Sequence, residues 1–298
     1  FFDGAWHDGL LPPADPGSAT MAAYKRFAQL VAAAPAFAIP THRAGWSAAH
    51  AELDGQTFAA WLDRHGLQDP ALRWYLDYCC RDDYGAGLDS VSAWAGLHYF
   101  ASRHGFHAPG DAESEREPVF TWPEGNAWLT ERLATPMRER LHTGRVVQRV
   151  REQRDGVELQ VWHGTVAEAW RAGTVVLAVP LFIAARLLET PPAALQQAAA
   201  RTTYAPWLVA NLQLDKPLVE RPGVAPSWDN VAYGTRGLGY VDAMHQSLRP
   251  VPGATVLTAY LSLPWADRQH LLDQSWRAWA GRVLTDLSSV HPDLPLRL

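Results

Sequence analysis

Histidine and cysteine side chains can bind a metal ion or act as nucleophiles, and the chain has 12 histidines and two cysteines. His98, His104 and His107 stand six and three positions apart, a spacing that could converge on a metal. No carboxylate or cysteine joins them in a recognised ligand pattern, so the sequence predicts no metal site. The two cysteines, Cys79 and Cys80, are adjacent, which favours buried thiols over a zinc knuckle or a redox pair.

The motifs of a serine hydrolase and of a dinucleotide-binding loop are both missing from the sequence. No serine stands in a G-x-S-x-G nucleophile elbow, and His245 near Asp242 and Ser247 does not make a triad, which is assembled in space. Residues 234–239 read G-x-x-G-x-G, the reverse of a dinucleotide fingerprint, and indicate a tight turn. His245 follows this turn on an expected strand and can titrate near neutrality, so it is our candidate acid or base, with a structural role as the alternative.

Composition restricts the class of protein. The chain has 298 residues, 48% of them hydrophobic, and a net charge of -5, which indicates a sizeable core and no nucleic-acid footprint. No apolar run approaches the ~20 residues of a membrane span. The 298 residues show no signal-peptide pattern and the cysteines do not require an oxidising compartment, so we expect a cytoplasmic protein.

Aromatic residues supply the candidate substrate contacts. Most of the 14 tryptophans fit apolar helix stripes and are expected in the core. Trp122 and Trp207 instead stand beside prolines at the ends of predicted elements, where an aromatic ring can line a pocket. We add Tyr240, which ends the glycine-rich run, as a third substrate candidate.

The elements that must position these residues change in character near residue 110. Apolar spacing predicts helices over 22–34, 54–66, 70–78 and 90–103, and polar residues 108–118 predict a linker or surface loop. A short strand at 119–122 and a helix at 127–141 are expected next. Alternating runs at 145–151 and 157–162 then flank Asp155-Gly156, a strong hairpin signal, and a third strand may cover 165–170. The apolar run 174–179 predicts a strand buried on both faces, ended by Pro180.

The last third of the chain is predicted to hold strands at 204–214 and 256–263, a strand–turn–strand at 233–241 and a helix at 265–289. The order of all these elements resembles the middle of the flavin-containing amine oxidoreductases, relatives of the monoamine oxidases and phytoene desaturases. The resemblance rests on residues 117–126 leading into a helix, on 146–150, on the hairpin and on 174–180, and residues 92–100 and 236–240 resemble a bacterial branch of FAD-dependent oxidoreductases.

This resemblance implies a site and a fold. Val147 matches the valine that meets the adenine end of FAD, and Ala178, Val179 and Pro180 match the segment that closes over the cofactor. The implied fold class is α+β, with a mixed or antiparallel sheet and packed helices as the substrate domain, plus a partial FAD-domain β-meander and buried strand. Residues 1–116 and 190–298 would form the substrate domain, and residues 117–189 the FAD part.

The resemblance also has gaps. The family's G-x-G-x-x-G unit and its C-terminal flavin segment have no match in the 298 residues, so we expect a fragment that is inactive and holds no stoichiometric FAD by itself. The lysine that many amine oxidases place near the flavin is also unmatched, because Lys25 and Lys216 stand outside any such motif.

The expected activity of the intact protein is oxidation of a small organic molecule by hydride transfer to FAD. A non-catalytic binding or scaffold protein that keeps the fold without FAD is the alternative, favoured by the missing G-x-G-x-x-G unit and the unmatched lysine. The expected partner is a small-molecule substrate, and the residues indicate neither its identity nor an oligomeric state.

Overall fold

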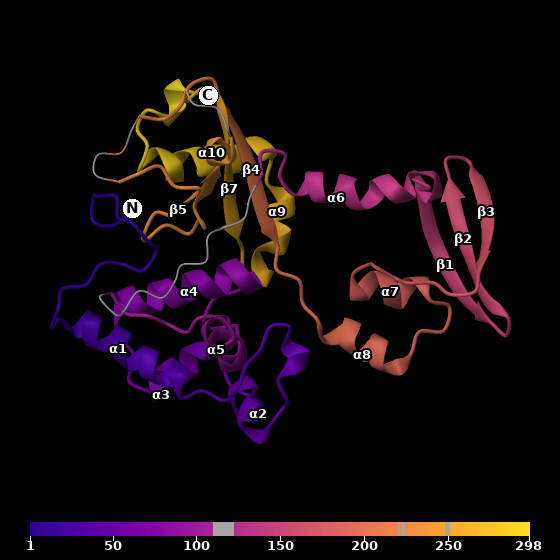
Figure 1. The fold of residues 1–298 in the computed structure, drawn as a ribbon, viewed down its shortest axis with the longest axis horizontal. Helices are drawn as coiled ribbons and strands as arrows, with labels where there is room; N and C mark the ends of the chain where they lie inside the picture. The colour runs from indigo at the N-terminus through magenta and orange to yellow at the C-terminus, as the bar shows by residue number, and fades with distance from the viewer. Residues whose placement is uncertain (110–121, 220, 222–223, 248–250) are drawn as a thin grey trace. The chain divides into compact units, whose positions relative to one another are not determined.

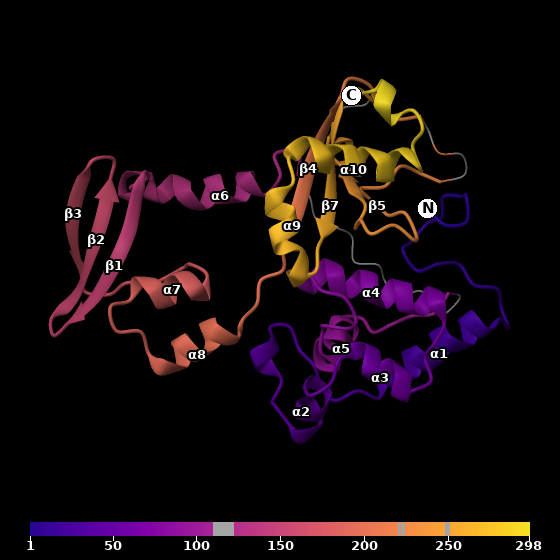
Figure 2. The same cartoon turned by 180° about the vertical axis from the view of Figure 1, so that it is seen from behind.

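The computed structural model describes residues 1–109, 122–219, 221, 224–247 and 251–298. The chain divides into two compact units, Phe1–Pro123 with Ala205–Leu298 (unit 1) and Glu124–Tyr204 (unit 2). Each unit contains helices and one antiparallel sheet, which confirms the predicted α+β class (Figures 1 and 2). None of the described helices combines the length and the apolar character needed to cross a bilayer.

The first half of unit 1 is helical. Its helices are α1 (Ala19–Ala32), α2 (Ala48–Asp54), α3 (Phe58–Arg64), α4 (Pro70–Tyr84) and α5 (Ala93–Ala101). Each helix begins after a residue whose side chain accepts a backbone N–H from the first turn, as Ser18, Asp69 and Ser92 do. The sequence did not predict α2, a short helix that begins with a capping box between Ser47 and His50.

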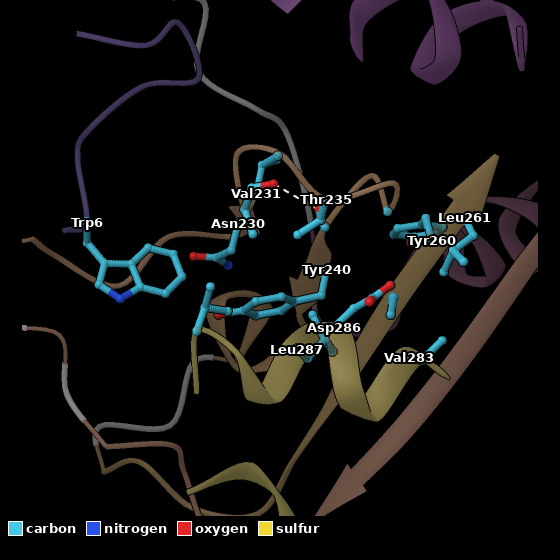
Figure 3. Close-up of a pocket in the computed structure, with 15 residues that line it drawn as sticks. Trp6, Asn230, Val231, Thr235, Tyr240, Tyr260, Leu261, Val283, Asp286 and Leu287 are labelled. Atoms are coloured by element: carbon cyan, nitrogen blue, oxygen red, sulfur yellow. Dashed lines mark hydrogen bonds between the residues drawn. The ribbon is translucent and has the colours of Figure 1, made fainter. Parts of the chain in front are cut away.

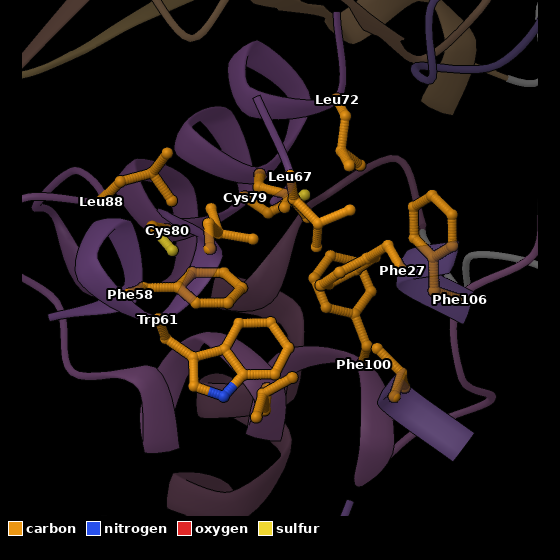
Figure 4. Packing of buried hydrophobic residues seen from close by; sticks show 14 of the residues in the cluster. Phe27, Phe58, Trp61, Leu67, Leu72, Cys79, Cys80, Leu88, Phe100 and Phe106 are labelled. Atoms are coloured by element: carbon orange, nitrogen blue, oxygen red, sulfur yellow. The ribbon is translucent and has the colours of Figure 1, made fainter. Parts of the chain in front are cut away.

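The helices of unit 1 share one aromatic core (Figure 4). Phe27 and Phe58 are fully buried, and the thiols of Cys79 and Cys80 are buried beside them. Burial raises the pKa of the Cys79 thiol to about 12, so this thiol is protonated and unreactive at neutral pH. Gly96 on α5 permits the helices to approach closely, because a Cβ there would lie 2.2 Å from Cδ1 of Phe58.

The second half of unit 1 builds a sheet and its covering helices. The strands run in the order β4-β7-β6-β5. Their bounds are β4 (Trp207–Leu214), β5 (Asp229–Asn230), β6 (Tyr240–Asp242) and β7 (Thr255–Ser262), and the helices are α9 (Arg268–Asp273) and α10 (Trp276–Ser288). Trp279, Val283 and Leu287 of α10 pack against Leu212 and Leu257 of the sheet. The helix predicted over 265–289 is interrupted, because Gln274 is extended and Ser275 caps the start of α10.

The loop that precedes β6 joins the sheet to the helices. The Tyr78 hydroxyl on α4 donates to the Leu238 carbonyl oxygen at 3.0 Å, and Arg81 donates to the Arg236 carbonyl oxygen at 2.8 Å. The expected strand–turn–strand over 233–241 is therefore a loop held by α4, followed by the short strand β6. These bonds place the C-terminal half of α4 next to β5, β6 and β7.

Unit 2 is built on a meander. Its elements are α6 (Asn126–Ala134), a 3-10 turn (Thr135–Arg140), β1 (Arg145–Gln153), β2 (Gly156–His163), β3 (Val166–Ala172), α7 (Leu181–Leu187) and α8 (Ala193–Arg201). The strands pair in the order β1-β2-β3, as the alternating runs predicted. Gly156 opens β2 with φ 147°, and a Cβ there would lie 2.7 Å from the Ala172 carbonyl oxygen on β3.

One predicted element of this unit is wrong. The run 174–179 is not a buried strand but an extended segment outside the described strands, and Val176 is 86% exposed. An apolar run becomes a doubly buried strand only when other strands and covering helices flank it. In the part of unit 2 that the structure describes, the sheet ends at β3 before this segment. The predicted linker at 108–118 and strand at 119–122 lie almost wholly outside the described residues.

Candidate functional site

Unit 1 contains a cavity of about 600 Å³ with aromatic walls, which we call the aromatic cavity. Trp6 lines it from the N-terminal segment, Trp74 from α4, and Trp228 and Tyr233 from the two sides of β5. The Trp74 and Tyr233 rings are in contact, with centroids 4.5 Å apart. A cavity of this volume is large enough for a small organic molecule, and ring faces suit an apolar body or a cation.

Two tryptophans that line the aromatic cavity have indole N–H groups without a hydrogen-bond acceptor among the described residues. The Nε1 atoms of Trp74 and Trp228 are buried, and neither finds a hydrogen-bond acceptor among the described residues. An unsatisfied buried N–H costs on the order of 1–3 kcal/mol, so such groups usually have a partner. Because both Nε1 atoms are covered by protein atoms, the two rings meet the aromatic cavity with their carbon atoms and not with their N–H groups.

The aromatic cavity also has a positive wall. Arg221 lines it, with its guanidinium carbon 4.4 Å from the Trp6 ring centroid. The same guanidinium donates to the side-chain oxygen of Asn230 on β5. Because a guanidinium has five N–H donors, this fixed group keeps donors for a further acceptor.

Asp229 on β5 lines the aromatic cavity and gives it a negative charge, and Asp82 on α4, which does not line the cavity, lies close enough to affect the pKa of Asp229; we call these two carboxylates the acidic pair. Burial raises the pKa of Asp229 to about 6, and the charge of Asp82 adds to this rise, against a stabilising hydrogen bond from the Asn230 N–H. Burial and the neighbouring Asp83 also raise the pKa of Asp82. Neither member of the acidic pair forms an ion pair within the described residues. Asp229 is therefore mostly ionised at neutral pH and open to a cation.

Two tyrosines complete the acidic region. Burial, followed by the charges of Asp229 and Asp82, raises the pKa of both Tyr78 and Tyr260, so both hydroxyls stay protonated. Tyr78 already donates its proton to a backbone carbonyl. The arrangement can therefore bind a cation, and its aromatic walls can hold an apolar group beside that cation.

A second, smaller cavity lies beside the first, between the sheet and α10 (Figure 3). Its volume of about 20 Å³ has room for a single water molecule and excludes a substrate. Tyr240 lines it, and the Tyr240 hydroxyl lies 2.6 Å from Nε2 of His291. Burial, with the charge of Arg221, lowers the pKa of His291 to about 4, so this histidine is neutral at pH 7.

The structure separates the residues that the sequence singled out. His245 lies in a 3-10 turn (Ala243–Gln246) rather than on a strand, and it is an exposed residue lining the aromatic cavity. Of the three substrate candidates, Tyr240 lines the small cavity and Trp207 on β4 is 39% exposed beside Tyr260, while Trp122 is half-buried. The substrate roles of these three residues and the acid–base role of His245 stay predictions, because the structure does not bring the four residues to one cavity.

The residues that the resemblance assigns to FAD lie in unit 2. Val147 is half-buried on β1, at a register shift between Val147 and Arg149. Ala178 and Val179 are exposed, and Pro180 precedes α7, where its carbonyl oxygen accepts the first backbone hydrogen bonds of the helix. This apolar segment fits contact with a flat ring. The sequence has no G-x-G-x-x-G loop to fit the diphosphate, so these residues fit only part of FAD.

The aromatic cavity itself was not predicted from the sequence. Trp74 stands on a helical stripe and was assigned to the core, and Asp82 and Asp229 lie far apart in the chain. The usable signal was the Trp228-Asp229-Asn230 sequence, which places a charge and an amide side chain directly after an indole. Within the described residues, no group of three or more His, Cys, Asp or Glu is arranged to hold a metal ion.

Comparisons with known proteins identify the family. The family model of flavin containing amine oxidoreductases matches residues 5–297. No curated protein sequence matches the chain.

Solved structures share the fold at low sequence identity. Wild-type putrescine oxidase bound to putrescine aligns with TM-score 0.69 and 17% identity, covering 96% of this chain and 62% of that one. Cyclohexylamine oxidase from Brevibacterium oxydans IH-35A aligns with TM-score 0.56 and 17% identity, covering 95% and 59%. The chain thus spans about three fifths of the length of these structures. With the family match over nearly its whole length, the chain belongs to the flavin-containing amine oxidoreductases.

Proposed function

We propose that this chain is the substrate-binding part of an FAD-dependent amine oxidase, with unit 1 holding the amine. The family match supports a flavin and an amine substrate, and putrescine oxidase and cyclohexylamine oxidase share the fold. Bound FAD would supply the hydride acceptor, and Val147 with the segment 178–180 would contact its rings. Because no loop of the sequence fits the diphosphate, we propose that these 298 residues alone do not retain stoichiometric FAD.

The observation that carries this proposal is the Asp229 carboxylate, which lines the aromatic cavity and has no ion-pair partner among the described residues. A small amine is an ammonium ion at neutral pH, and ionised Asp229 attracts it. The ring faces of Trp6, Trp74 and Trp228 add cation–π attraction and exclude water from the apolar part of the molecule. His245, an exposed residue lining the same cavity, is the candidate to accept the proton that the ammonium must lose before oxidation.

The alternative is a non-catalytic binding protein that keeps the cavity but not the cofactor. The missing diphosphate loop and the unmatched lysine favour it. It shares the aromatic cavity with the enzyme proposal, so only cofactor and turnover separate the two.

The test uses the full-length protein that contains this chain. We expect it to purify with the visible absorbance of bound flavin, and an amine added without oxygen should bleach that absorbance. Asp229→Asn should raise KM for the amine, whereas Asp273→Asn at the exposed end of α9 should leave KM unchanged. A colourless full-length protein that ignores added FAD would refute the enzyme and leave the binding protein.

A further inference from the structure

The corner where α9 meets α10 carries large apolar side chains that are exposed to solvent. Trp265 precedes α9, Leu272 lies near its end and Trp276 begins α10, and these residues are 55, 66 and 74% exposed. We call these three residues the tryptophan corner. The two helices already bury other apolar side chains, because Leu271 and Trp279 pack against the sheet of unit 1 (Figure 2). The core of unit 1 therefore does not account for the tryptophan corner.

An arginine accompanies each tryptophan of the corner. The guanidinium carbon of Arg268 lies 5.8 Å from the Trp265 ring centroid, and that of Arg277 lies 5.5 Å from the Trp276 ring centroid. A guanidinium over an indole ring keeps its N–H groups at the edge of the ring, where they can donate to an acceptor outside the protein. The corner thus combines apolar rings with hydrogen-bond donors that carry positive charge.

The charge around the tryptophan corner is positive, although the whole chain carries a net charge of -5. Residues 264–282 contain three arginines and two aspartates. One of these aspartates, Asp267, lies 3.8 Å from the guanidinium of Arg236, which offsets its charge from outside the segment. Asp286, the next acidic residue along the chain, is half-buried at the small cavity. The local charge is therefore complementary to an anionic surface.

The size of the corner favours a lipid surface over a protein partner. Its three side chains expose on the order of 400 Å², about half of the ~800 Å² that each partner of a stable protein complex buries. They line neither the aromatic cavity nor the small cavity, so neither cavity explains their exposure. Tryptophan is the residue that settles at the headgroup level of a bilayer, and arginine binds phosphate groups.

We propose that the tryptophan corner binds the surface of an anionic lipid bilayer. Its three apolar side chains lie at the headgroup level, and the guanidinium groups of Arg268 and Arg277 bind lipid phosphates. An attachment through three side chains is shallow and reversible, and it depends on both apolar area and charge. This inference goes beyond the proposed function and does not rest on it, because neither flavin nor amine takes part.

Binding is measured by co-sedimentation of the full-length protein with lipid vesicles. Vesicles of phosphatidylcholine with about 30% phosphatidylserine are compared with vesicles of phosphatidylcholine alone. We expect at least about fivefold stronger binding to the anionic vesicles, and about 0.5 M salt should remove most of that difference by screening the arginines. No binding to the anionic vesicles, or equal binding to both kinds, would overturn the inference.

Two variants locate the contact. Arg277→Gln should weaken binding to the anionic vesicles about fivefold, the effect of one arginine at a lipid surface. Trp276→Ser should weaken it by at least as much, and the exposure of this ring leaves the fold intact. The matched controls are Arg26→Gln on the exposed face of α1 and Trp46→Ser, whose ring is 62% exposed, and both should bind as the unchanged protein does.

Two results would refute this assignment. In the first, the corner variants bind the anionic vesicles as tightly as the control variants. In the second, Trp276→Ser leaves vesicle binding unchanged and instead converts a dimer to a monomer in sedimentation velocity, which would make the corner a protein interface.

Discussion

Gly96→Ala is the substitution whose cost the structure defines most directly. Gly96 lies in the middle of α5 and is buried against Phe58, and an added Cβ would lie 2.2, 2.5 and 2.5 Å from three atoms of the Phe58 ring. Phe58 is fully buried, with the rings of Phe27 and Trp61 around it, so it has little room to move. Overpacking of this kind costs about 1–3 kcal/mol or more, and the better helix propensity of alanine returns up to about 1 kcal/mol.

We therefore expect Gly96→Ala to lower the free energy of unfolding by up to about 2 kcal/mol, the difference between the larger cost and the propensity gain. For a unit of this size that corresponds to a fall in Tm of up to about 8 °C, measured by calorimetry. The matched control is Gly281→Ala on α10, where nothing lies within 4 Å of the added Cβ. That change should raise stability by about 0.5–1 kcal/mol. If Gly96→Ala stabilises the protein as Gly281→Ala does, then α5 and α3 do not pack as described.

Two further predictions concern single titratable or hydrogen-bonded groups. The pKa of Asp229 is raised from 3.8 to about 6 in the folded chain, so ionisation of this carboxyl group destabilises the fold at higher pH. Asp229→Asn should therefore raise Tm at pH 7.5, and the gain in Tm should shrink as the pH falls from 6 to 4. A gain that does not depend on pH would contradict the raised pKa. Tyr240→Phe removes the 2.6 Å hydrogen bond between the Tyr240 hydroxyl and buried His291. Unfolding by denaturant should then show a free energy of unfolding lower by about 1–3 kcal/mol. An unchanged midpoint would show that water replaces the hydroxyl.

Much of the local structure could be predicted because it depends on neighbours in the chain. Pro70 after the cap Asp69 marks the start of α4, and the alternating runs around Asp155 become β1 and β2. The prediction at 174–179 failed because whether an apolar run becomes a buried strand depends on what pairs with it, and that is not a property of the run. The sequence analysis did not predict α2, because this short helix has little apolar spacing. Reciprocal hydrogen bonds between Ser47 and His50 at its start support it instead.

The candidate site depends on contacts between distant parts of the chain. Asp82 and Asp229 affect each other only because Tyr78 and Arg81 of α4 bind the loop that precedes β6, which pairs with β5. No spacing in the sequence shows that contact. The sequence pointed to His245, and the structure gives it an exposed position at the cavity, whereas burial raises the pKa of a carboxyl group there, that of Asp229, toward neutrality.

The tryptophans show why composition alone could not locate the site. A core indole and a cavity indole both bury a large apolar surface, and they differ in what their N–H meets. Trp279 donates to the Leu271 carbonyl oxygen at 3.2 Å and is satisfied within the fold. Trp74 and Trp228 lack an acceptor among the described residues, and their rings line the aromatic cavity. Trp94 also lacks one, but it stacks on His98 and lines neither of the two cavities described above, so a buried N–H without an acceptor does not by itself locate a cavity.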